Sequence, residues 1–134
     1  MTDVKKVLYA DDDVDDKLWV SEAWKGMNCS VHIEFVDNGR QVLDYLAGLP
    51  TAEMPSLIVL DLNMPGLDGR QTLKRLKDDS KYVAIPVVIV TTSSNVVDVE
   101  MCKRLGASLY LIKPDTHTEW QGLVRKFEPF IGGF

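Results

Sequence analysis

The sequence predicts an α/β domain in which a five-stranded parallel sheet carries helices on both faces. Short apolar segments alternate with segments of helical periodicity along the whole chain, and most of the apolar segments are continuous. Continuous β-rich runs are typical of parallel strands that are covered on both faces. Strand and helix alternation of this kind predicts a doubly wound sheet with right-handed crossovers.

Five segments are predicted to form the strands. They span residues 7–10, 31–36, 57–60, 87–90 and 109–112. The second segment alternates apolar and polar residues, which predicts an edge strand with one covered face. The last three are apolar throughout, which predicts that each is covered on both faces.

The segment after the second strand has two interpretations. Residues 37–39 read Asp-Asn-Gly and could form a hairpin turn. However, Val42 and Leu46 follow at helical spacing, and Asn38 with Gln41 resembles a capping box. We therefore predict a helix here.

The other strands are also followed by helical patterns. The first helix carries Val20, Ala23 and Trp24 on one side, and Gly106 is a plausible stop for the fourth. The last helix is predicted to have one apolar stripe, introduced by Thr116 and Glu119 at capping-box spacing. The stripe consists of Trp120, Leu123, Val124, Phe127 and Ile131.

Composition narrows the class of protein. The chain has 134 residues, which predicts one domain, and a net charge of -5, which argues against nucleic-acid binding. It shows neither a secretory signal nor an apolar run of membrane-spanning length, so we expect a cytoplasmic protein without membrane contact. Cys29 and Cys102 are the two cysteines, and we expect them to be reduced thiols.

Polar side chains follow four of the predicted strands. Asp11 and Asp12 follow the first strand, Asp61 the third, Thr91 the fourth and Lys113 the fifth. Each alone could cap a helix or a turn. In a doubly wound sheet, however, the carboxyl ends of the strands form the ligand crevice. We therefore expect these side chains to converge.

Three carboxylates in one crevice require raised pKa values or a bound cation. Oxygen ligands without His or Cys favour Mg²⁺. With Mg²⁺ in place, Asp61 could attack a phosphoryl donor in line, while Lys113 and the Thr91 hydroxyl hold the phosphoryl oxygens. The expected product is an aspartyl phosphate.

The loop that follows Asp61 contains turn-forming residues. Pro65 fixes a backbone angle, and Gly66 and Gly69 permit positive φ. We expect a tight turn that aims a backbone carbonyl at the metal.

Together these motifs resemble the receiver domain of bacterial two-component response regulators. The resemblance is carried by Asp11-Asp12, the 61–69 loop, Thr91 after the fourth strand and Lys113-Pro114 after the fifth. It implies a flavodoxin-like (βα)5 sheet with strand order 2-1-3-4-5. It also implies a phosphate-acceptor switch rather than an enzyme, with at most slow loss of its own phosphate.

The resemblance assigns roles to individual residues. Asp61 matches the phosphorylated aspartate, Asp12 a direct Mg²⁺ ligand and Asp11 a water-mediated one. The backbone carbonyl of Asn63 matches a further metal ligand.

The resemblance extends to the signalling residues and to the partners. Thr91 and Lys113 match the phosphate-sensing pair, and Tyr110 matches an aromatic residue whose rotamer is coupled to that threonine. The implied output surface comprises the fourth helix, the fifth strand and the fifth helix, with a homodimer as one mode of association. The implied partners are a histidine kinase or histidine phosphotransfer protein upstream and a protein target downstream.

Two local features depart from this simple match. Asp115 stands where a bulky apolar residue is common in the family. Asp13, Asp15 and Asp16 add negative charge near the site, and we expect them to cap and solvate the first helix rather than to bind metal.

Three other functions are alternatives to a phosphate-acceptor switch. A haloacid-dehalogenase-type phosphatase normally carries an acidic general acid two residues after its nucleophile, where this chain has Asn63. A nucleotide-binding domain would show a glycine-rich phosphate motif, which the sequence lacks. A docking module that keeps the pocket without using phosphate is the third alternative.

We expect one receiver domain over residues 5–131 and no output domain after it. The chain would then be a stand-alone receiver or a receiver excised from a longer protein.

Overall fold

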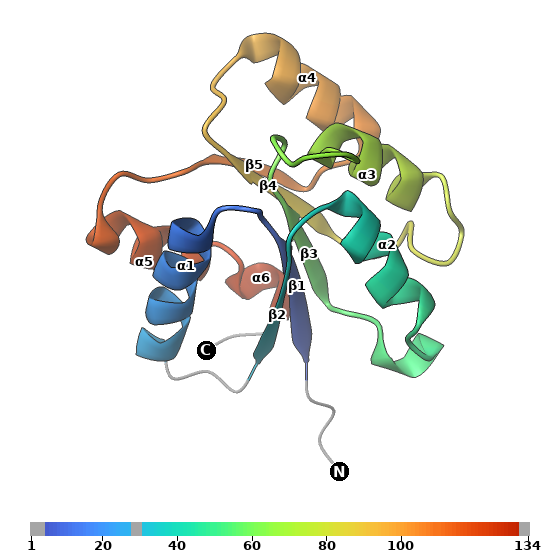
Figure 1. Ribbon diagram of the computed structural model, residues 1–134, viewed down its shortest axis with the longest axis horizontal. Coiled ribbons are helices and arrows are strands. Elements are labelled where there is room, and N and C mark those ends of the chain that lie inside the picture. Colours follow the sequence, from blue (N-terminus) through green and yellow to red (C-terminus); the bar gives the residue numbers. More distant parts are fainter. Residues whose placement is uncertain (1–4, 28–30, 132–134) are drawn as a thin grey trace.

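The computed structural model describes residues 5–27 and 31–131, which form a five-stranded parallel sheet with helices on both faces (Figure 1). The sheet order is β2-β1-β3-β4-β5, and every neighbouring pair is parallel. Both findings confirm the prediction. The strands are β1 (Lys6–Ala10), β2 (His32–Val36), β3 (Leu57–Leu60), β4 (Val87–Thr91) and β5 (Leu109–Ile112).

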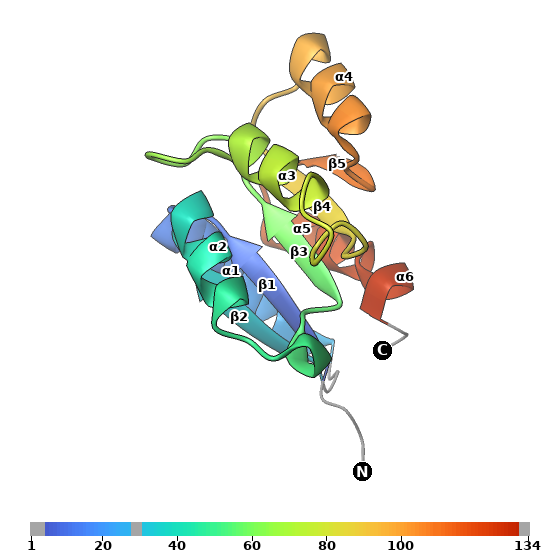
Figure 2. The same cartoon turned by 90° about the vertical axis from the view of Figure 1, so that its right-hand side faces the viewer.

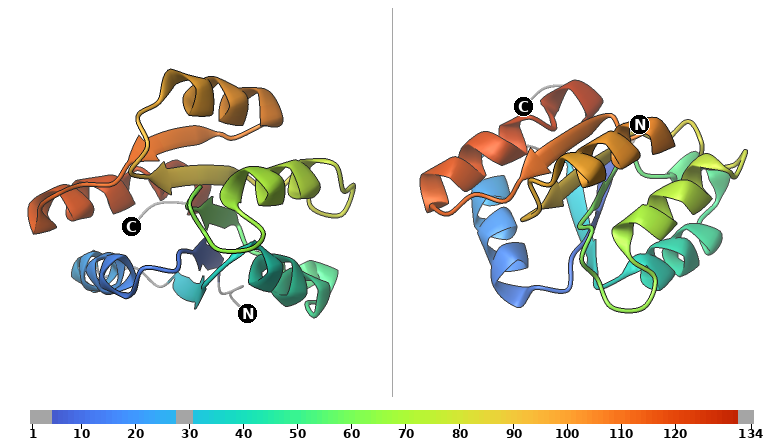
Figure 3. Two further views of the ribbon diagram at one scale, coloured as in Figure 1. Left: turned by 45° about the horizontal axis from the view of Figure 1, so that its top comes forward. Right: turned by 90° about the horizontal axis from the view of Figure 1, so that it is seen from above.

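The helices divide into two layers. One layer contains α1, α5 and α6, and the other contains α2, α3 and α4 (Figure 3). Figure 2 views the sheet from the side of the second layer. The helices are α1 (Val14–Gly26), α2 (Gly39–Ala47), α3 (Gly69–Lys77), α4 (Val96–Leu105), α5 (His117–Arg125) and α6 (Glu128–Ile131), with a short 3-10 helix, η1 (Thr51–Glu53), before β3.

The alternation of side chains along each strand produces two cores. In β1, Leu8 and Ala10 pack with the α2 and α3 residues, whereas Val7 and Tyr9 pack with the α1 and α5 residues. All four side chains are buried. The continuous apolar runs of β1, β3 and β4 are therefore explained by burial on both faces.

The prediction that β5 is covered on both faces is wrong. β5 is the last strand in the sheet and is only half-buried, and the Ile112 side chain is 46% exposed. The strand is apolar although it lies at an edge, so it places apolar surface near α4 and α5. The other edge strand, β2, is half-buried as its alternating sequence predicted.

The predicted single helix at the end of the chain is divided into α5 and α6. α5 begins as expected after Thr116, whose hydroxyl accepts a hydrogen bond from the Glu119 N–H at 3.3 Å. It ends at Arg125 instead of continuing to Ile131. Pro129 explains the break, because proline has no N–H and its ring would clash with the carbonyl four residues earlier, that of Arg125.

The segment after β2 is a helix and not a hairpin. Asn38 caps α2 by accepting a hydrogen bond from the Gln41 N–H at 2.9 Å. The Gln41 side chain accepts from the Asp37 N–H at 2.7 Å rather than from the Asn38 N–H. The predicted cap is thus present, but the reciprocal hydrogen bond, from the backbone to the Gln41 side chain, comes from the residue before Asn38.

The structure also agrees with the expected environment of Trp120 and the expected end of α4. Trp120 lies on α5 and is buried in the core. α4 stops at Gly106, which has a left-handed φ of 105°. Cys102 is a buried free thiol, whereas Cys29 lies outside the described residues. Within the described part of the chain, no helix is long and apolar enough to cross a membrane.

Candidate functional site

The carboxyl ends of β1, β3 and β5 bring Asp11, Asp61 and Lys113 together. The Lys113 ammonium nitrogen lies 2.7 Å from Asp61 Oδ2 and 3.0 Å from Asp11 Oδ2. Backbone hydrogen bonds to neighbouring strands fix the two aspartates at the edge of the sheet. The Asp11 N–H donates to the Val36 carbonyl, and the Asp61 N–H donates to the Ala10 carbonyl. These side chains therefore converge as the strand-end pattern predicted.

Three carboxylates form an acidic cluster at this edge of the sheet. Oxygen atoms of Asp11, Asp12 and Asp61 all lie within 4.8 Å of one another. Asp11 and Asp61 are buried and Asp12 is exposed, and the only ion-pair partner of Asp11 Oδ2 among the described residues is the Lys113 ammonium, 3.0 Å away. Two buried carboxylates and a third beside them, with one ammonium between them, suit a hard divalent cation. The residues present therefore fit divalent-metal binding.

The electrostatics of this cluster depend on Lys113. Burial raises the pKa of Asp11 to about 6, and the negative charge of Asp61 adds to this effect, while the Asp13 N–H and Lys113 oppose it. Burial alone would lower the pKa of Lys113, but hydrogen bonds to Asp16 and Asp61 and the contact with Asp11 outweigh burial and raise it. Lys113 is therefore a permanent positive charge at ordinary pH.

Asp16 enters the site, which was not predicted. Asp13 caps α1 as expected and accepts hydrogen bonds from the N–H groups of Asp15 and Asp16. The Asp16 carboxylate, however, accepts a hydrogen bond from Lys113 Nζ at 2.6 Å. The sequence does contain a signal for this position, because Asp16 precedes the buried Val20 by four residues and so shares its helix face.

The β3–α3 loop orients the Asp61 carboxylate. The Asn63 N–H donates to Asp61 Oδ1 at 3.1 Å, and Gly66 has the predicted positive φ, at 72°. Gly69, which also permits a positive φ, does not adopt one. A Cβ at Gly69 would instead lie 2.2 Å from the Asp61 carbonyl oxygen and 2.8 Å from Leu62 Cα. Gly69 is required for close backbone approach.

Replacing Gly69 with alanine is therefore expected to destabilise the protein more than the same change at Gly66. The Gly69 variant must move backbone atoms, which we expect to cost about 2–3 kcal/mol. The Gly66 variant has open space and is expected to lose about 1 kcal/mol through its left-handed backbone. Urea unfolding of both variants measures the difference, and equal losses would contradict this account of Gly69.

The loop ends in a helix cap that the sequence analysis did not predict. Asp68 and Gln71 form a complete capping box at the start of α3. Pro65, which was predicted to shape the turn, is exposed and directly precedes Gly66. The sequence signal for the cap, Asp-x-x-Gln before a helical pattern, was present but was interpreted only as part of the turn.

Thr91 and Tyr110 each contact the backbone of Ser93. Thr91 ends β4 in a fully buried position, and its carbonyl accepts a hydrogen bond from the Lys113 N–H at 2.8 Å. The Thr91 hydroxyl lies 3.5 Å from the Ser93 N–H nitrogen, and the Tyr110 hydroxyl donates to the Ser93 carbonyl at 2.8 Å. Across the described residues no hydrogen bond joins the two side chains directly. Their connection runs through the backbone of Ser93.

A second polar cluster joins α3 to α4. The Arg70 guanidinium donates to Asp98 Oδ1 from Nε at 3.0 Å and from Nη2 at 2.6 Å, and the Ser93 hydroxyl donates to Asp98 Oδ2 at 2.7 Å. The hydrogen bonds from Ser93 and Arg70 lower the pKa of Asp98. This cluster was not predicted, because its members are brought together only by the packing of α3 against α4.

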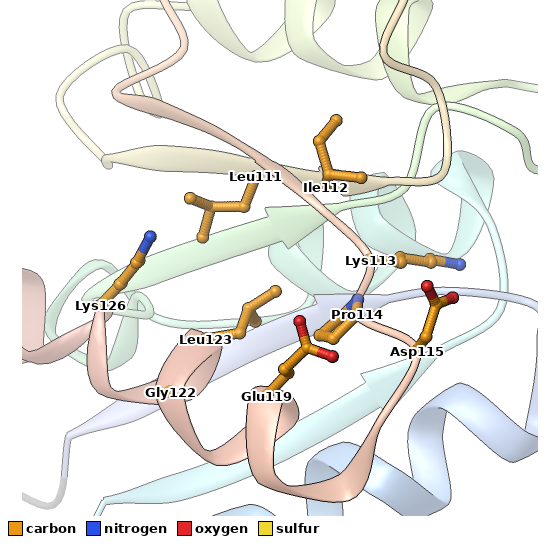
Figure 4. A pocket seen from close by; sticks show the side chains of 9 residues that line it. All are labelled: Leu111, Ile112, Lys113, Pro114, Asp115, Glu119, Gly122, Leu123 and Lys126. Atoms are coloured by element: carbon orange, nitrogen blue, oxygen red, sulfur yellow. The ribbon is translucent and has the colours of Figure 1, made fainter.

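A groove lies between β5 and α5, beside the acidic cluster. Its volume is about 540 Å³. Figure 4 shows the Lys113 side chain pointing away from Leu111 and Leu123, which line the groove. Asp115 and Pro114 also line the groove. The Asp115 side chain therefore adds a carboxylate to its lining.

Comparison with known proteins identifies the family. The family model of the Response regulator receiver domain matches residues 7–125. The chain is 30% identical to the response regulator Rcp1 of Synechocystis sp. over 129 residues, which cover 94% of this chain and 88% of Rcp1. The solved Mn²⁺-bound form of Rcp1 superposes with a TM-score of 0.85 at 29% identity, covering 97% of this chain and 96% of that one.

Two further relatives show the same relationship. The phosphorylated cyanobacterial phytochrome response regulator RcpA has a TM-score of 0.86 at 30% identity, covering 96% of this chain and 94% of its own. The Arabidopsis thaliana two-component response regulator ARR7 is 33% identical over 116 residues, which cover 81% of this chain and 55% of ARR7. The chain thus belongs to the response regulator receiver domain family of two-component signalling.

Proposed function

We propose that this receiver domain accepts a phosphoryl group on Asp61 in a Mg²⁺-dependent reaction and thereby signals to a protein partner. One observation carries the proposal. The Asp61 carboxylate lies 2.7 Å from the Lys113 ammonium and has two further carboxylates whose oxygens lie within 4.8 Å. Such a site combines a nucleophile, a metal-binding cluster and a fixed cation for the phosphoryl group.

The residues of the chain can be given roles in the transfer. Asp11, Asp12, Asp61 and the Asn63 carbonyl would hold Mg²⁺, which supplies positive charge to offset that of the phosphoryl group. The Asn63 N–H and Lys113 each hold one oxygen of Asp61, so the carboxylate is oriented before the reaction.

In the transfer itself, an Asp61 oxygen bonds to phosphorus, and the bond from phosphorus to the donor breaks. The donor group leaves with its electron pair. Lys113 and the Thr91 hydroxyl would then bind the phosphoryl oxygens. The upstream donor would be a histidine kinase or a histidine phosphotransfer protein, as for receiver domains in general.

We propose a switch rather than an enzyme because the site has no general acid after its nucleophile. Position 63 is an exposed asparagine, which can neither give a proton to a leaving group nor take one from an attacking water. Loss of the phosphoryl group is then expected to be slow, so that the phosphorylated state persists as a signal.

The expected output surface consists of α4, β5 and α5. Exposed apolar side chains support this choice, because Val96 is 72% exposed, Val97 66% and Ile112 46%. Tyr110 on β5 donates to the Ser93 carbonyl, which follows Thr91 at the site. A change at the phosphorylated site therefore has a short structural route to this surface. A downstream protein or a second copy of the chain could bind there.

Acetyl phosphate tests the chemistry. With Mg²⁺, wild-type protein is expected to gain one hydroxylamine-labile phosphate by intact mass spectrometry, and Asp61→Asn is expected to gain none. Omission of Mg²⁺ should abolish the gain. An unchanged adduct on Asp61→Asn would contradict the proposal, and steady phosphate release from many small esters would favour a phosphatase instead.

Beryllofluoride tests the output surface, since it mimics the phosphoryl group without covalent chemistry. Amide chemical shifts in α4, β5 and α5 are expected to change when Mg²⁺ and beryllofluoride are added. Asp61→Asn is the matched control and should show no such change. Shifts confined to the site loops in the wild type would contradict the assigned surface, and light scattering in both states measures whether a homodimer forms.

A further inference from the structure

We propose that Asp16 is a positioning residue that acts on the phosphoacceptor site through Lys113. Its negative charge competes with an incoming phosphoryl anion for the Lys113 ammonium and at the same time strengthens cation binding at the acidic cluster. This inference rests on the proposed function of Asp61 and goes beyond it, because it assigns the regulation of that site to α1.

The geometry around Lys113 carries the inference. Its ammonium nitrogen lies 2.6 Å from Asp16 Oδ2, 2.7 Å from Asp61 Oδ2 and 3.0 Å from Asp11 Oδ2. The Lys113 side chain is 8% exposed, so little water reaches it. An ammonium group has three protons and three carboxylate neighbours here. A phosphoryl oxygen can gain a hydrogen bond from Lys113 only if one of these contacts weakens.

Asp16 is the neighbour that does not belong to the metal cluster. The cluster of oxygens within 4.8 Å consists of Asp11, Asp12 and Asp61. Asp16 is instead held at the start of α1, where its N–H donates to Asp13 Oδ1 at 3.1 Å. Among the described residues, the contact of its carboxylate with the site is the ion pair with Lys113, which joins the start of α1 to the β5–α5 loop.

The charges at the site predict how neutralising Asp16 changes the affinities for a cation and for a phosphoryl anion. Asp11, Asp16 and Asp61 contact one ammonium, and Asp12 lies beside Asp11 and Asp61, so the site has an excess of negative charge when all four are ionised. Neutralising Asp16 lowers the attraction for a cation and also lowers the repulsion of an anion. The two affinities should therefore change in opposite directions, whereas structural loosening would weaken both.

The test compares Asp16→Asn with Asp15→Asn. Asn keeps the shape and one acceptor oxygen of Asp, and Asp15 is an exposed neighbour with the same charge. Calorimetry measures the Kd for Mg²⁺, and amide chemical shifts measure the apparent Kd for beryllofluoride at saturating Mg²⁺. For Asp16→Asn we expect Mg²⁺ binding to weaken and beryllofluoride binding to tighten, each by about three- to tenfold. Asp15→Asn should stay within about twofold of wild type for both.

A second variant separates charge from contact. Asp16→Glu keeps the charge and is expected to return the Mg²⁺ affinity to that of the wild type. The inference is overturned if Asp16→Asn matches Asp15→Asn, or if both affinities fall together. If the wild type binds neither Mg²⁺ nor beryllofluoride, the proposed function fails and this inference with it. If the wild type binds both and Asp16→Asn changes neither, only the inference fails.

Discussion

Replacing Lys113 with methionine is expected to lower the free energy of unfolding by about 3 kcal/mol at pH 8 in the absence of divalent metal. Lys113 is the common counter-ion of Asp11, Asp16 and Asp61, and Asp11 and Asp61 are buried. Removing one member of a buried ion pair leaves uncompensated charge, which costs roughly 3–5 kcal/mol. The partial exposure of Asp16 places this variant at the lower end.

Urea unfolding at two pH values measures this loss. Lys126→Met is the matched control, because Lys126 is exposed, and it should change stability by no more than about 0.5 kcal/mol. Lowering the pH to 5 or adding Mg²⁺ should reduce the loss at position 113, since either one offsets the carboxylate charge. A loss that is independent of both pH and Mg²⁺ would show that Lys113 contributes packing rather than charge.

Asp11→Asn is expected to raise the stability of the metal-free protein at pH 7.5 by about 2–3 kcal/mol. Burial raises the pKa of Asp11 from 3.8 to about 6 in the folded protein. Between these values the folded state holds the proton more tightly, so wild-type stability falls as the pH rises from about 4 to above 6. Each pKa unit corresponds to about 1.4 kcal/mol. The asparagine variant does not ionise and avoids this loss.

A pH series of urea unfolding for wild type and Asp11→Asn tests the assignment. The two stabilities should be similar near pH 4 and separate by pH 7, with the variant above the wild type. The exposed Asp12 is the control, and Asp12→Asn should change the stability at pH 7.5 by no more than about 0.5 kcal/mol. A variant less stable than wild type at pH 7.5 would mean that the Lys113 contact outweighs the burial of the Asp11 carboxylate.

The strands were predictable because burial on two faces demands continuous apolar runs. Periodicity does not specify their lateral order, which came from the resemblance to receiver domains. For the same reason the apolar run of β5 did not reveal that the strand lies at an edge and leaves Ile112 half exposed. The break between α5 and α6 could have been predicted from Pro129, but the apolar stripe continues across it.

The residues at the strand ends were predictable for the same physical reason. Parallel strands end at one edge of the sheet, so Asp11, Asp61 and Lys113 had to lie close together. The contact of Asp16 with Lys113 depends on how α1 packs, and the Arg70–Asp98 pair depends on how α3 approaches α4. Such contacts depend on how distant elements pack together, so patterns in the local sequence do not predict them.

The most direct test of the central claim locates the phosphate. Borohydride reduces an aspartyl phosphate to homoserine, and peptide mass spectrometry then identifies the position. After incubation with acetyl phosphate and Mg²⁺, homoserine is expected at position 61 alone, and none is expected without Mg²⁺. Homoserine at Asp11, Asp12 or Asp16, or its absence from every position, would contradict the assignment of Asp61 as the phosphoacceptor.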